Sequence, residues 1–299
     1  MRLSVVMPVY NAAPYVRAAA SSALMQMQGD AELICVDDGS TDTSWDEIAR
    51  ISDPRLKRLR QENQGAAAAR NAALDLAQGD AIAFLDADDL ALPGRFEIPL
   101  QALTADSSLS IVGASLRVID PQGLVLRDDG KSAQDTYLRW ITLFNSPFTF
   151  SAVTVRRSDL RFDSSVIPAE DYAYCADMLD RGKGVILADV LCAYRVHPGQ
   201  VTQRRNDALR DSGNRISQRK IRERLGVDVP LELVFLMRHL LAFGWERLSP
   251  EHHAMAFEAQ RTLQHLFSLF KRGDGLDAGD VAKIEEGFCH FGLKKSASS

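Results

Sequence analysis

The sequence AIAFLDADD, at residues 81–89, sets an acidic cluster directly after a short apolar run. The run at residues 81–85 is typical of a strand that is covered on both faces. In an extended segment Asp86 and Asp88 face the same way, and two such carboxylates repel each other unless a cation or a donor lies between them. A hard divalent cation, held by carboxylates and by substrate phosphates, is a common solution. Acidic triplets also fill turns and cap helices, so the motif alone leaves both interpretations open.

Three further strand–helix pairs precede this stretch. Apolar runs predict strands at residues 3–9, 32–36 and 55–60, and helical periodicity predicts helices at residues 14–27, 43–51 and 64–77. This alternation predicts an α/β fold with a mostly parallel sheet and helices on both faces. Ligands of such sheets bind outside the carboxyl ends of the strands. The polar pairs at residues 10–11 and 37–38 follow two of those ends, so we expect them beside the acidic cluster.

The rest of the chain divides into a mixed region and a helical region. Residues 109–119, 150–156, 185–188 and 191–196 are predicted strands, and residues 133–143 and 169–181 are predicted helices. Four helices are predicted after that, at residues 204–225, 231–248, 251–270 and 278–291. The sequence therefore predicts one domain of residues 1–203 and a C-terminal all-helical extension of residues 204–299.

Composition excludes several classes of protein. The 299 residues are 46% hydrophobic and 25% charged, with a formal net charge of −5, which are ordinary values for a globular protein. The mild acidity argues against a partner nucleic acid, because phosphate contacts need a basic surface. The sequence has neither a signal-peptide pattern nor an uncharged apolar stretch of about 18 residues, so we expect a cytoplasmic location. Four widely spaced cysteines are predicted to be buried, reduced thiols.

Charge is unevenly distributed within the helical extension. Residues 204–224 carry eight cationic side chains against three acidic ones, and an apolar stretch at residues 231–245 follows. Such a pair of segments can hold a protein peripherally on the inner, anionic face of a membrane. The alternative is a solvated basic helix, followed by a helix that packs on the main domain or on a second subunit of a homo-oligomer. The sequence leaves both alternatives open.

Four blocks of sequence, in this order, resemble the family 2 inverting glycosyltransferases of the GT-A fold. They are VVMPVYN at residues 5–11, VDDGSTD at 36–42, NQGAAAARN at 63–71 and FLDADD at 84–89. The resemblance weakens at residues 145–157 and recovers at residues 170–171 and 194–199. It covers residues 1–203 and implies a nucleotide-binding half at residues 1–90 and an acceptor half at residues 91–203.

The resemblance implies a metal-dependent enzyme of polysaccharide biosynthesis. Such an enzyme moves a sugar from a nucleotide-sugar donor, here expected to be a UDP-sugar, to a hydroxyl of a cell-surface glycan or lipid-linked acceptor. The resemblance implies that the nucleotide pocket is lined by Pro8, Tyr10 and Asn11, that the nucleobase is bound by Asp37, and that Arg70 lies near the nucleobase or the phosphates. It implies that Asp86 contacts the ribose, that Asp88 binds Mn²⁺ or Mg²⁺, and that His197 reaches the metal or the diphosphate. Asp171 would act as the general base.

These roles are chemically consistent. A divalent cation stabilises the leaving diphosphate, and a carboxylate on the opposite face accepts the proton of the incoming hydroxyl. Inversion in a single displacement requires no second, nucleophilic carboxylate. Each residue also has a structural alternative: Asp37 could cap a helix, Arg70 could lie on a solvated face, Asp171 could occupy a favourable first helical turn, and His197 could be an ordinary loop residue.

Three questions stay open at this point. Asp89 is either a further metal ligand or a supporting residue. Some relatives carry a histidine within residues 148–151, where this chain has Phe150 and Ser151. A nucleotidyltransferase is disfavoured because residues 11–14, after the first strand, lack a Gly-rich basic loop, but a catalytically inactive scaffold of the same fold remains an alternative function.

Overall fold

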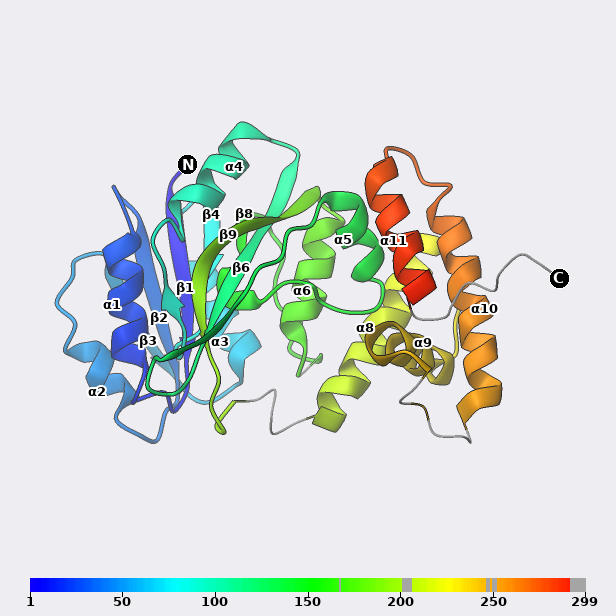
Figure 1. The fold of residues 1–299 in the computed structure, drawn as a ribbon. Coiled ribbons are helices and arrows are strands. Elements are labelled where there is room, and N and C mark those ends of the chain that lie inside the picture. The colour runs from blue at the N-terminus through cyan, green and yellow to red at the C-terminus, as the bar shows by residue number, and fades with distance from the viewer. Residues whose placement is uncertain (167, 201–205, 246–247, 249–251, 291–299) are drawn as a thin grey trace. The chain divides into compact units, whose positions relative to one another are not determined.

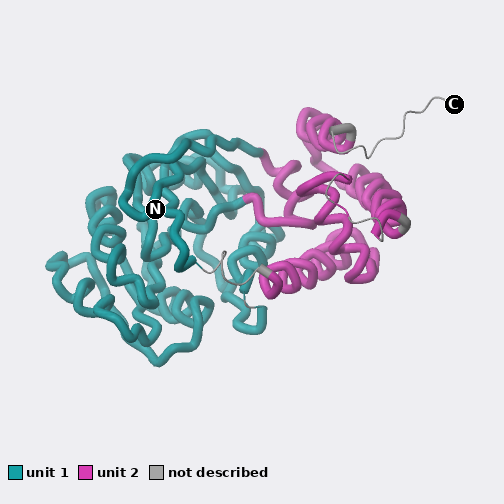
Figure 2. Tube along the Cα trace, turned by 60° about the horizontal axis from the view of Figure 1, so that its bottom comes forward, with its two compact units in different colours: residues 1–133, 148–206 teal, residues 134–147, 207–299 magenta. Residues whose placement is uncertain are grey.

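The computed structural model describes residues 1–166, 168–200, 206–245, 248 and 252–290. The chain forms two compact units, one of residues 1–133 and 148–206 and one of residues 134–147 and 207–299 (Figure 2). We describe each unit by itself.

The first unit is built on one mixed sheet. Its elements are β1 (Leu3–Val9), α1 (Val16–Gln26), β2 (Glu32–Asp38), α2 (Ser44–Ala49), β3 (Leu56–Gln61), α3 (Ala66–Leu76), β4 (Ala81–Phe84), β5 (Leu90–Ala91), α4 (Glu97–Ala105), β6 (Leu109–Ile119), β7 (Val125–Asp129), the 3₁₀ helix η1 (Phe150–Ala152), β8 (Thr154–Arg156), α6 (Glu170–Leu179) and β9 (Lys183–Arg195).

The strands follow the order β3-β2-β1-β4-β8-β6-β9-β5, and β7 pairs with β6 outside this path (Figure 1). Strands β1 to β4 pair in parallel, as the strand–helix alternation predicts. Strand β8 is antiparallel to both β4 and β6, so the sheet is mixed beyond the fourth strand. Two segments predicted as separate strands, residues 185–188 and 191–196, are one long strand, β9.

Apolar side chains fix the layers of this unit. Alternate residues of β1, including Val5 and Met7, are fully buried in one cluster with Val16 and Ala20 of α1. Helix α3 packs against β1 and β2, and its buried residues, such as Ala73, lie outside that cluster. Helices therefore cover both faces of the sheet, and the polar strand ends are left at its edge.

The second unit is helical. It contains α5 (Asp135–Ile141), α8 (Asn206–Leu225), α9 (Leu231–Phe243), α10 (His253–Phe270) and α11 (Ala278–His290). The segment at residues 134–147, which the sequence analysis placed inside the first domain, belongs here. The reason is packing: Trp140 and Phe144 are buried in the helical core, where the Trp140 ring contacts those of Phe267 and Phe270. The predicted domain boundary at residue 203 stays a proposal, and residues 134–147 are assigned to the helical unit rather than to the first domain.

The cations of α8 are largely used inside the helical unit. Arg210 pairs with Asp207 and lies near Asp211, and Lys220 is buried and pairs with Glu223. Arg224 donates to the backbone of Arg139 and to the Thr142 hydroxyl. These contacts all lie inside the helical unit, and the first two arginines of the basic segment, Arg204 and Arg205, lie outside the described residues. Attachment to a membrane stays a prediction.

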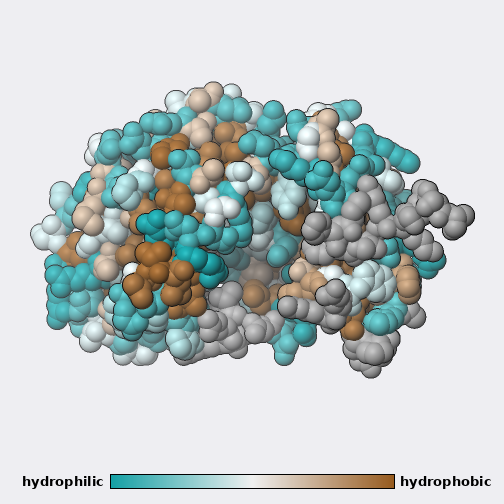
Figure 3. All heavy atoms as spheres, in the orientation of Figure 1, coloured by the Kyte–Doolittle hydropathy of each residue, from teal (hydrophilic) through white to brown (hydrophobic). Residues whose placement is uncertain are grey.

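Within the described ranges, no helix has both the length and the apolar composition that a membrane span needs. The face drawn in Figure 3 mixes hydrophilic and apolar side chains. Leu124, Val125 and Leu126, in the β6–β7 hairpin, are each more than half exposed. Cys35, Cys175 and Cys192 are buried free thiols, as predicted, and the side chain of Cys289 lies outside the described part of the chain.

Candidate active site

The ends of β1 and β2 form one polar rim. The two strands end side by side, since Val9 pairs with Asp37. Asn11 has a positive φ of 49°, and its side-chain oxygen accepts a hydrogen bond from the Thr41 N–H at 2.8 Å. The Asn11 N–H donates to the Ser40 hydroxyl at 3.0 Å. Pro8 is half-buried and Tyr10 is 52% exposed, so this cross-linked rim offers backbone groups and one aromatic face to a ligand.

Asp37 and Asp38 have different partners. The Asp37 side chain is fully buried, and its Oδ2 lies 3.0 Å from Nε of Arg60. Asp38 accepts hydrogen bonds from the N–H groups of Gln64 and Gly65, at 2.9 and 2.8 Å, and so satisfies donors at the start of α3. Asp38 therefore stabilises the start of α3, whereas Asp37 lies at the end of the strand, where recognition of the nucleobase is predicted.

Asp88 and His197 meet after β4. Nε2 of His197 lies 3.0 Å from Oδ2 of Asp88, although the two residues are 109 positions apart. Nδ1 of the same ring accepts a hydrogen bond from the Gly199 N–H at 3.2 Å. A neutral imidazole has one donor and one acceptor nitrogen, so Nε2 carries the proton here and donates to Asp88. The structure thus brings together the two residues predicted to act on the metal.

The turn after β4 concentrates negative charge. Asp89 is 1% exposed, and its Oδ1 accepts a hydrogen bond from the Arg195 N–H at 2.8 Å. The Arg195 guanidinium donates through Nε to the Asp88 carbonyl at 2.8 Å. Burial, followed by the charge of Asp86, raises the pKa of Asp88, and burial together with Asp88 raises the pKa of Asp89 well above its usual value. Burial is the larger cause of both shifts, and the close spacing of the carboxylates adds an excess of negative charge.

That excess of negative charge fits a divalent cation. Asp88 and His197, which contact each other, offer a carboxylate oxygen and an imidazole nitrogen, donors that suit Mn²⁺ and, through the oxygen, Mg²⁺; Asp86 lies two residues before Asp88 and pairs with Arg70. A cation bound there would lower the pKa values of the neighbouring carboxyls. The residues present therefore fit the predicted metal.

Arg70 links the turn at residues 86–89, here called the acidic turn, to a second acidic pair, Glu170 and Asp171. Its guanidinium is buried and lies 3.0 Å from Asp86 through Nη2 and 2.7 Å from Glu170 through Nη1. The rings of Phe150 and Phe162 lie 4.8 and 5.6 Å from it, so the charge is shielded from water. Arg70 is neither on a solvated face nor directed only at a nucleotide site, because it holds β4 and α6 together.

Replacing Arg70 by Met is expected to lower the free energy of unfolding at pH 7 by about 3 kcal/mol. The change removes one partner of a buried network and leaves Glu170 and Asp86 without compensation. Urea denaturation measures the effect. Arg161→Met is the matched control, because Arg161 pairs with Asp75 on the surface at 3.1 Å, a kind of contact worth at most about 1 kcal/mol. Equal losses in the two variants would contradict the assignment.

Asp171 lies in the first turn of α6, next to Glu170. The preceding Ala169 has a positive φ of 114°, rare for a residue with a side chain, and this bend starts the helix. Burial, then the charge of Glu170, raises the pKa of Asp171 from 3.8 to about 6, while Arg70 opposes the rise. A carboxyl with this pKa is half-deprotonated near pH 6 and suits general-base catalysis near neutrality. Tyr172 and Tyr174 are buried core residues.

Sequence reasoning missed the partners that hold these groups. Glu170 and Arg195 stand inside recognised blocks, yet nothing in their spacing indicates the contacts to Arg70 and Asp88. Ser151, whose hydroxyl accepts a hydrogen bond from the Asp86 N–H at 3.0 Å, carries no sequence signal.

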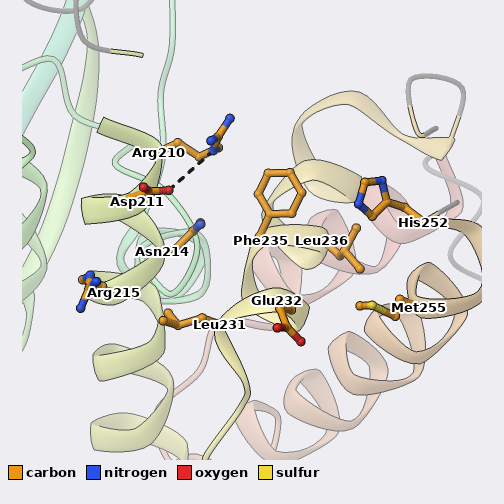
Figure 4. Close-up of a pocket in the computed structure, with 10 residues that line it drawn as sticks. All are labelled: Arg210, Asp211, Asn214, Arg215, Leu231, Glu232, Phe235, Leu236, His252 and Met255. Atoms are coloured by element: carbon orange, nitrogen blue, oxygen red, sulfur yellow. Dashed lines mark ion pairs between the residues drawn. The ribbon is translucent and has the colours of Figure 1, made fainter. Parts of the chain in front are cut away.

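A cavity of about 580 Å³ lies in the helical unit, between α8, α9 and α10 (Figure 4). Its walls combine Phe235, Leu236 and Met255 with charged groups, among them Arg210, which pairs with Asp211. None of the predicted site residues lines it.

Residues 4–160 match the family model described as glycosyl transferase family 2. The chain belongs to this family. It is 36% identical over 207 residues to an uncharacterized glycosyltransferase of Haemophilus influenzae, a match that spans 67% of this chain and 80% of the other. A similar match, 30% identical over 205 residues, spans 67% of this chain and 79% of WfaP from Escherichia coli, a UDP-Glc:α-D-GlcNAc-diphosphoundecaprenol β-1,3-glucosyltransferase.

Solved structures share the fold. TarS of S. aureus, residues 1–349 in complex with UDP, superposes with a TM-score of 0.60 at 19% identity, covering 97% of this chain and 92% of that one. The mannosyltransferase PcManGT of Pyrobaculum calidifontis, in complex with GDP-Man and Mn²⁺, superposes with a TM-score of 0.57 at 19% identity, covering 98% and 81%. The predicted GT-A fold with a helical extension and the resemblance to family 2 are confirmed, and the chain is a glycosyltransferase.

Proposed function

We propose that this glycosyltransferase moves a sugar from UDP to a hydroxyl of a lipid-linked or polysaccharide acceptor, with inversion at the anomeric carbon. The observation that carries the proposal is the buried network around Arg70. One guanidinium holds both Asp86, beside the predicted metal ligand Asp88, and Glu170, beside the predicted base Asp171. With these roles, Arg70 would fix the diphosphate-binding side of the site to the general base.

The reaction is a single displacement. The acceptor oxygen attacks the anomeric carbon while the bond from that carbon to the diphosphate oxygen breaks, and its electron pair leaves with UDP. Asp171 accepts the proton of the acceptor hydroxyl. Its raised pKa makes it a better base than an exposed aspartate, yet it remains mostly deprotonated at pH 7. No covalent sugar–enzyme bond forms, so one carboxylate suffices.

The metal is part of the proposal. Asp88, with His197 and Asp86, would hold Mn²⁺ or Mg²⁺, and the cation would stabilise the charge of the leaving diphosphate. To coordinate through Nε2, His197 would move its proton to Nδ1 and give up the hydrogen bond from Gly199. The Mn²⁺ named with PcManGT supports this choice.

The donor and acceptor follow from the relatives. The solved structure of TarS is a complex with UDP. The name of WfaP gives UDP-Glc as its donor and α-D-GlcNAc-diphosphoundecaprenol as its acceptor. Asp37 lies at the end of β2 and pairs with Arg60, and we propose that it binds the nucleobase of the donor. PcManGT is named in complex with GDP-Man, so the donor screen includes a guanine nucleotide sugar. A cytoplasmic location suits a donor of this kind and is proposed with it.

A thermal-shift screen tests the donor. UDP-glucose, UDP-GlcNAc, UDP-galactose and GDP-mannose are added with and without Mn²⁺, and stabilisation scales with occupancy. At a concentration about 100 times the dissociation constant, the correct donor stabilises the protein by about 2.7 kcal/mol. We expect a UDP-sugar to stand out and its effect to depend on Mn²⁺. Stabilisation by GDP-mannose alone would overturn the assignment of a uridine nucleotide as the donor.

A catalytically inactive scaffold is the competing function. It requires neither a base nor a cation site, yet Asp171, Asp88 and His197 are all present and connected as described. UDP release that increases when an acceptor is added would exclude the scaffold.

A further inference from the structure

Arg95 is a buried cation outside the groups described so far. It lies between β5 and α4 and is fully buried. Its guanidinium donates to the Ser151 carbonyl through Nε and Nη2, at 3.0 and 2.9 Å, to the Phe84 carbonyl at 3.0 Å, to the Val153 carbonyl at 2.9 Å and to the Thr154 hydroxyl at 2.9 Å. All of these acceptors are neutral.

A buried charge of this kind is costly unless its hydrogen bonds are complete. Burial lowers the pKa of Arg95 to about 10, so the side chain is still a cation at neutral pH. Its acceptors come from β4, η1 and β8, three segments that meet directly behind the acidic turn. Arg95 therefore fastens these segments to one point.

Ser151 carries that constraint to the acidic turn. It is 1% exposed, its carbonyl accepts both Nε and Nη2 of Arg95, and its hydroxyl accepts the Asp86 N–H at 3.0 Å. The Phe84 carbonyl, held by Arg95, lies two residues before Asp86. The start of the turn is thus tied twice, through the Phe84 carbonyl and through the Ser151 hydroxyl at Asp86.

We propose that Arg95 and Ser151 are positioning residues, which hold the turn at residues 86–89 in the geometry that binds the metal and the diphosphate. The inference rests on the proposed function and adds to it residues that contact neither substrate. Groups that orient metal ligands in this indirect way typically change metal affinity or activity by about 10- to 100-fold when they are replaced.

A purely structural role would be different, and Arg156 provides the comparison. This residue of β8 also donates to backbone carbonyls, those of Leu109, Leu103 and Asp106, at 3.1, 2.7 and 3.3 Å. None of these acceptors lies in the acidic turn. Arg156→Met therefore removes a similar set of hydrogen bonds from the same sheet without releasing residues 86–89.

The first measurement is the affinity of the full chain for Mn²⁺ in the presence of UDP, by isothermal titration calorimetry. We expect Arg95→Met to weaken it by about 10-fold or more and Ser151→Ala by about 3-fold or more, with less than about 2-fold for Arg156→Met. Because both residues act through one connection, the double variant should be weaker than Arg95→Met by less than about 2-fold. Ser151→Ala removes a single hydroxyl, so it tests the proposal even if Arg95→Met fails to fold.

The second measurement needs no metal. Hydrogen exchange of the protein alone should be faster by about 10-fold for the amides of residues 84–89 in Arg95→Met, and close to wild type there in Arg156→Met. If Arg95→Met and Ser151→Ala match Arg156→Met in both measurements, the inference is overturned. If the wild type binds no Mn²⁺ with UDP, the proposed function fails at its metal, and hydrogen exchange still decides whether Arg95 and Ser151 hold the turn.

Discussion

Replacing Asp171 by Asn is expected to lower kcat for sugar transfer by about 10³-fold while UDP binding changes by less than about 2-fold. The amide keeps the shape of the side chain but cannot accept the proton of the acceptor hydroxyl, and general-base catalysis is worth about 10²- to 10⁴-fold. UDP release with acceptor measures kcat, and calorimetry measures UDP binding. Asp75→Asn, which removes a surface charge paired with Arg161, is the matched control and should keep full activity.

The same substitution should stabilise the fold at pH 7. The pKa of Asp171 is about 6 in the folded protein against 3.8 for an ordinary aspartate, so the folded state binds the proton more tightly. Its ionisation therefore removes stability as the pH rises from about 4 to about 6, by about 2–3 kcal/mol in total. The uncharged Asn does not carry that cost. Loss of activity together with an unchanged or higher Tm would separate catalysis from unfolding, whereas full activity would refute the role of Asp171.

Replacing Asp88 by Ala is expected to remove the metal dependence of UDP binding and to lower transfer by about 10²-fold or more. Asp88 is the carboxylate in contact with His197, and its removal leaves only His197 and Asp86 of the proposed cation site. Loss of a metal's charge stabilisation at the leaving group is worth several kcal/mol of barrier. Thermal shifts with UDP, with and without Mn²⁺, report the binding, and UDP release reports transfer.

The control for this variant is Asp128→Ala, which breaks an exposed pair with Arg117 in the β6–β7 hairpin. That variant should keep both the Mn²⁺ effect and the rate. A chelator added to the wild type should reproduce the Asp88→Ala result. An Asp88→Ala protein that still binds UDP more tightly with Mn²⁺ would move the metal site elsewhere.

Local patterns in the sequence predicted the part of the fold that places the site. Strands β1, β2 and β4 are buried, nearly continuous apolar runs, β3 is a partly exposed strand, and helical periodicity marks the segments between them, so their order and parallel pairing follow from periodicity and connection rules. The same rules place residues 10–11, 37–38 and 86–89 at one edge. The resemblance added His197 and Asp171. These residues lie so far along the chain from β4 that periodicity and connection rules cannot place them beside it.

Long-range packing explains what the sequence could not predict. The segment containing Trp140 has an ordinary helical pattern, and only its aromatic contacts with Phe267 and Phe270 assign it to the helical unit. The Arg70–Glu170 pair joins residues 100 positions apart. A sequence shows which side chains carry charge, but the partners of a buried charge depend on which elements meet in three dimensions.

The central claim, that Asp171 is the base of an inverting glycosyltransferase, is tested most directly by the pH dependence of kcat/KM. UDP release is measured from about pH 4.5 to pH 8 for the wild type and for Asp171→Asn. Because the pKa of Asp171 is raised to about 6, the wild-type value should fall tenfold per pH unit below pH 6 and level off above it. In Asp171→Asn the residual rate should lose this limb. A limb near pH 6 that persists unchanged in the variant would contradict the account.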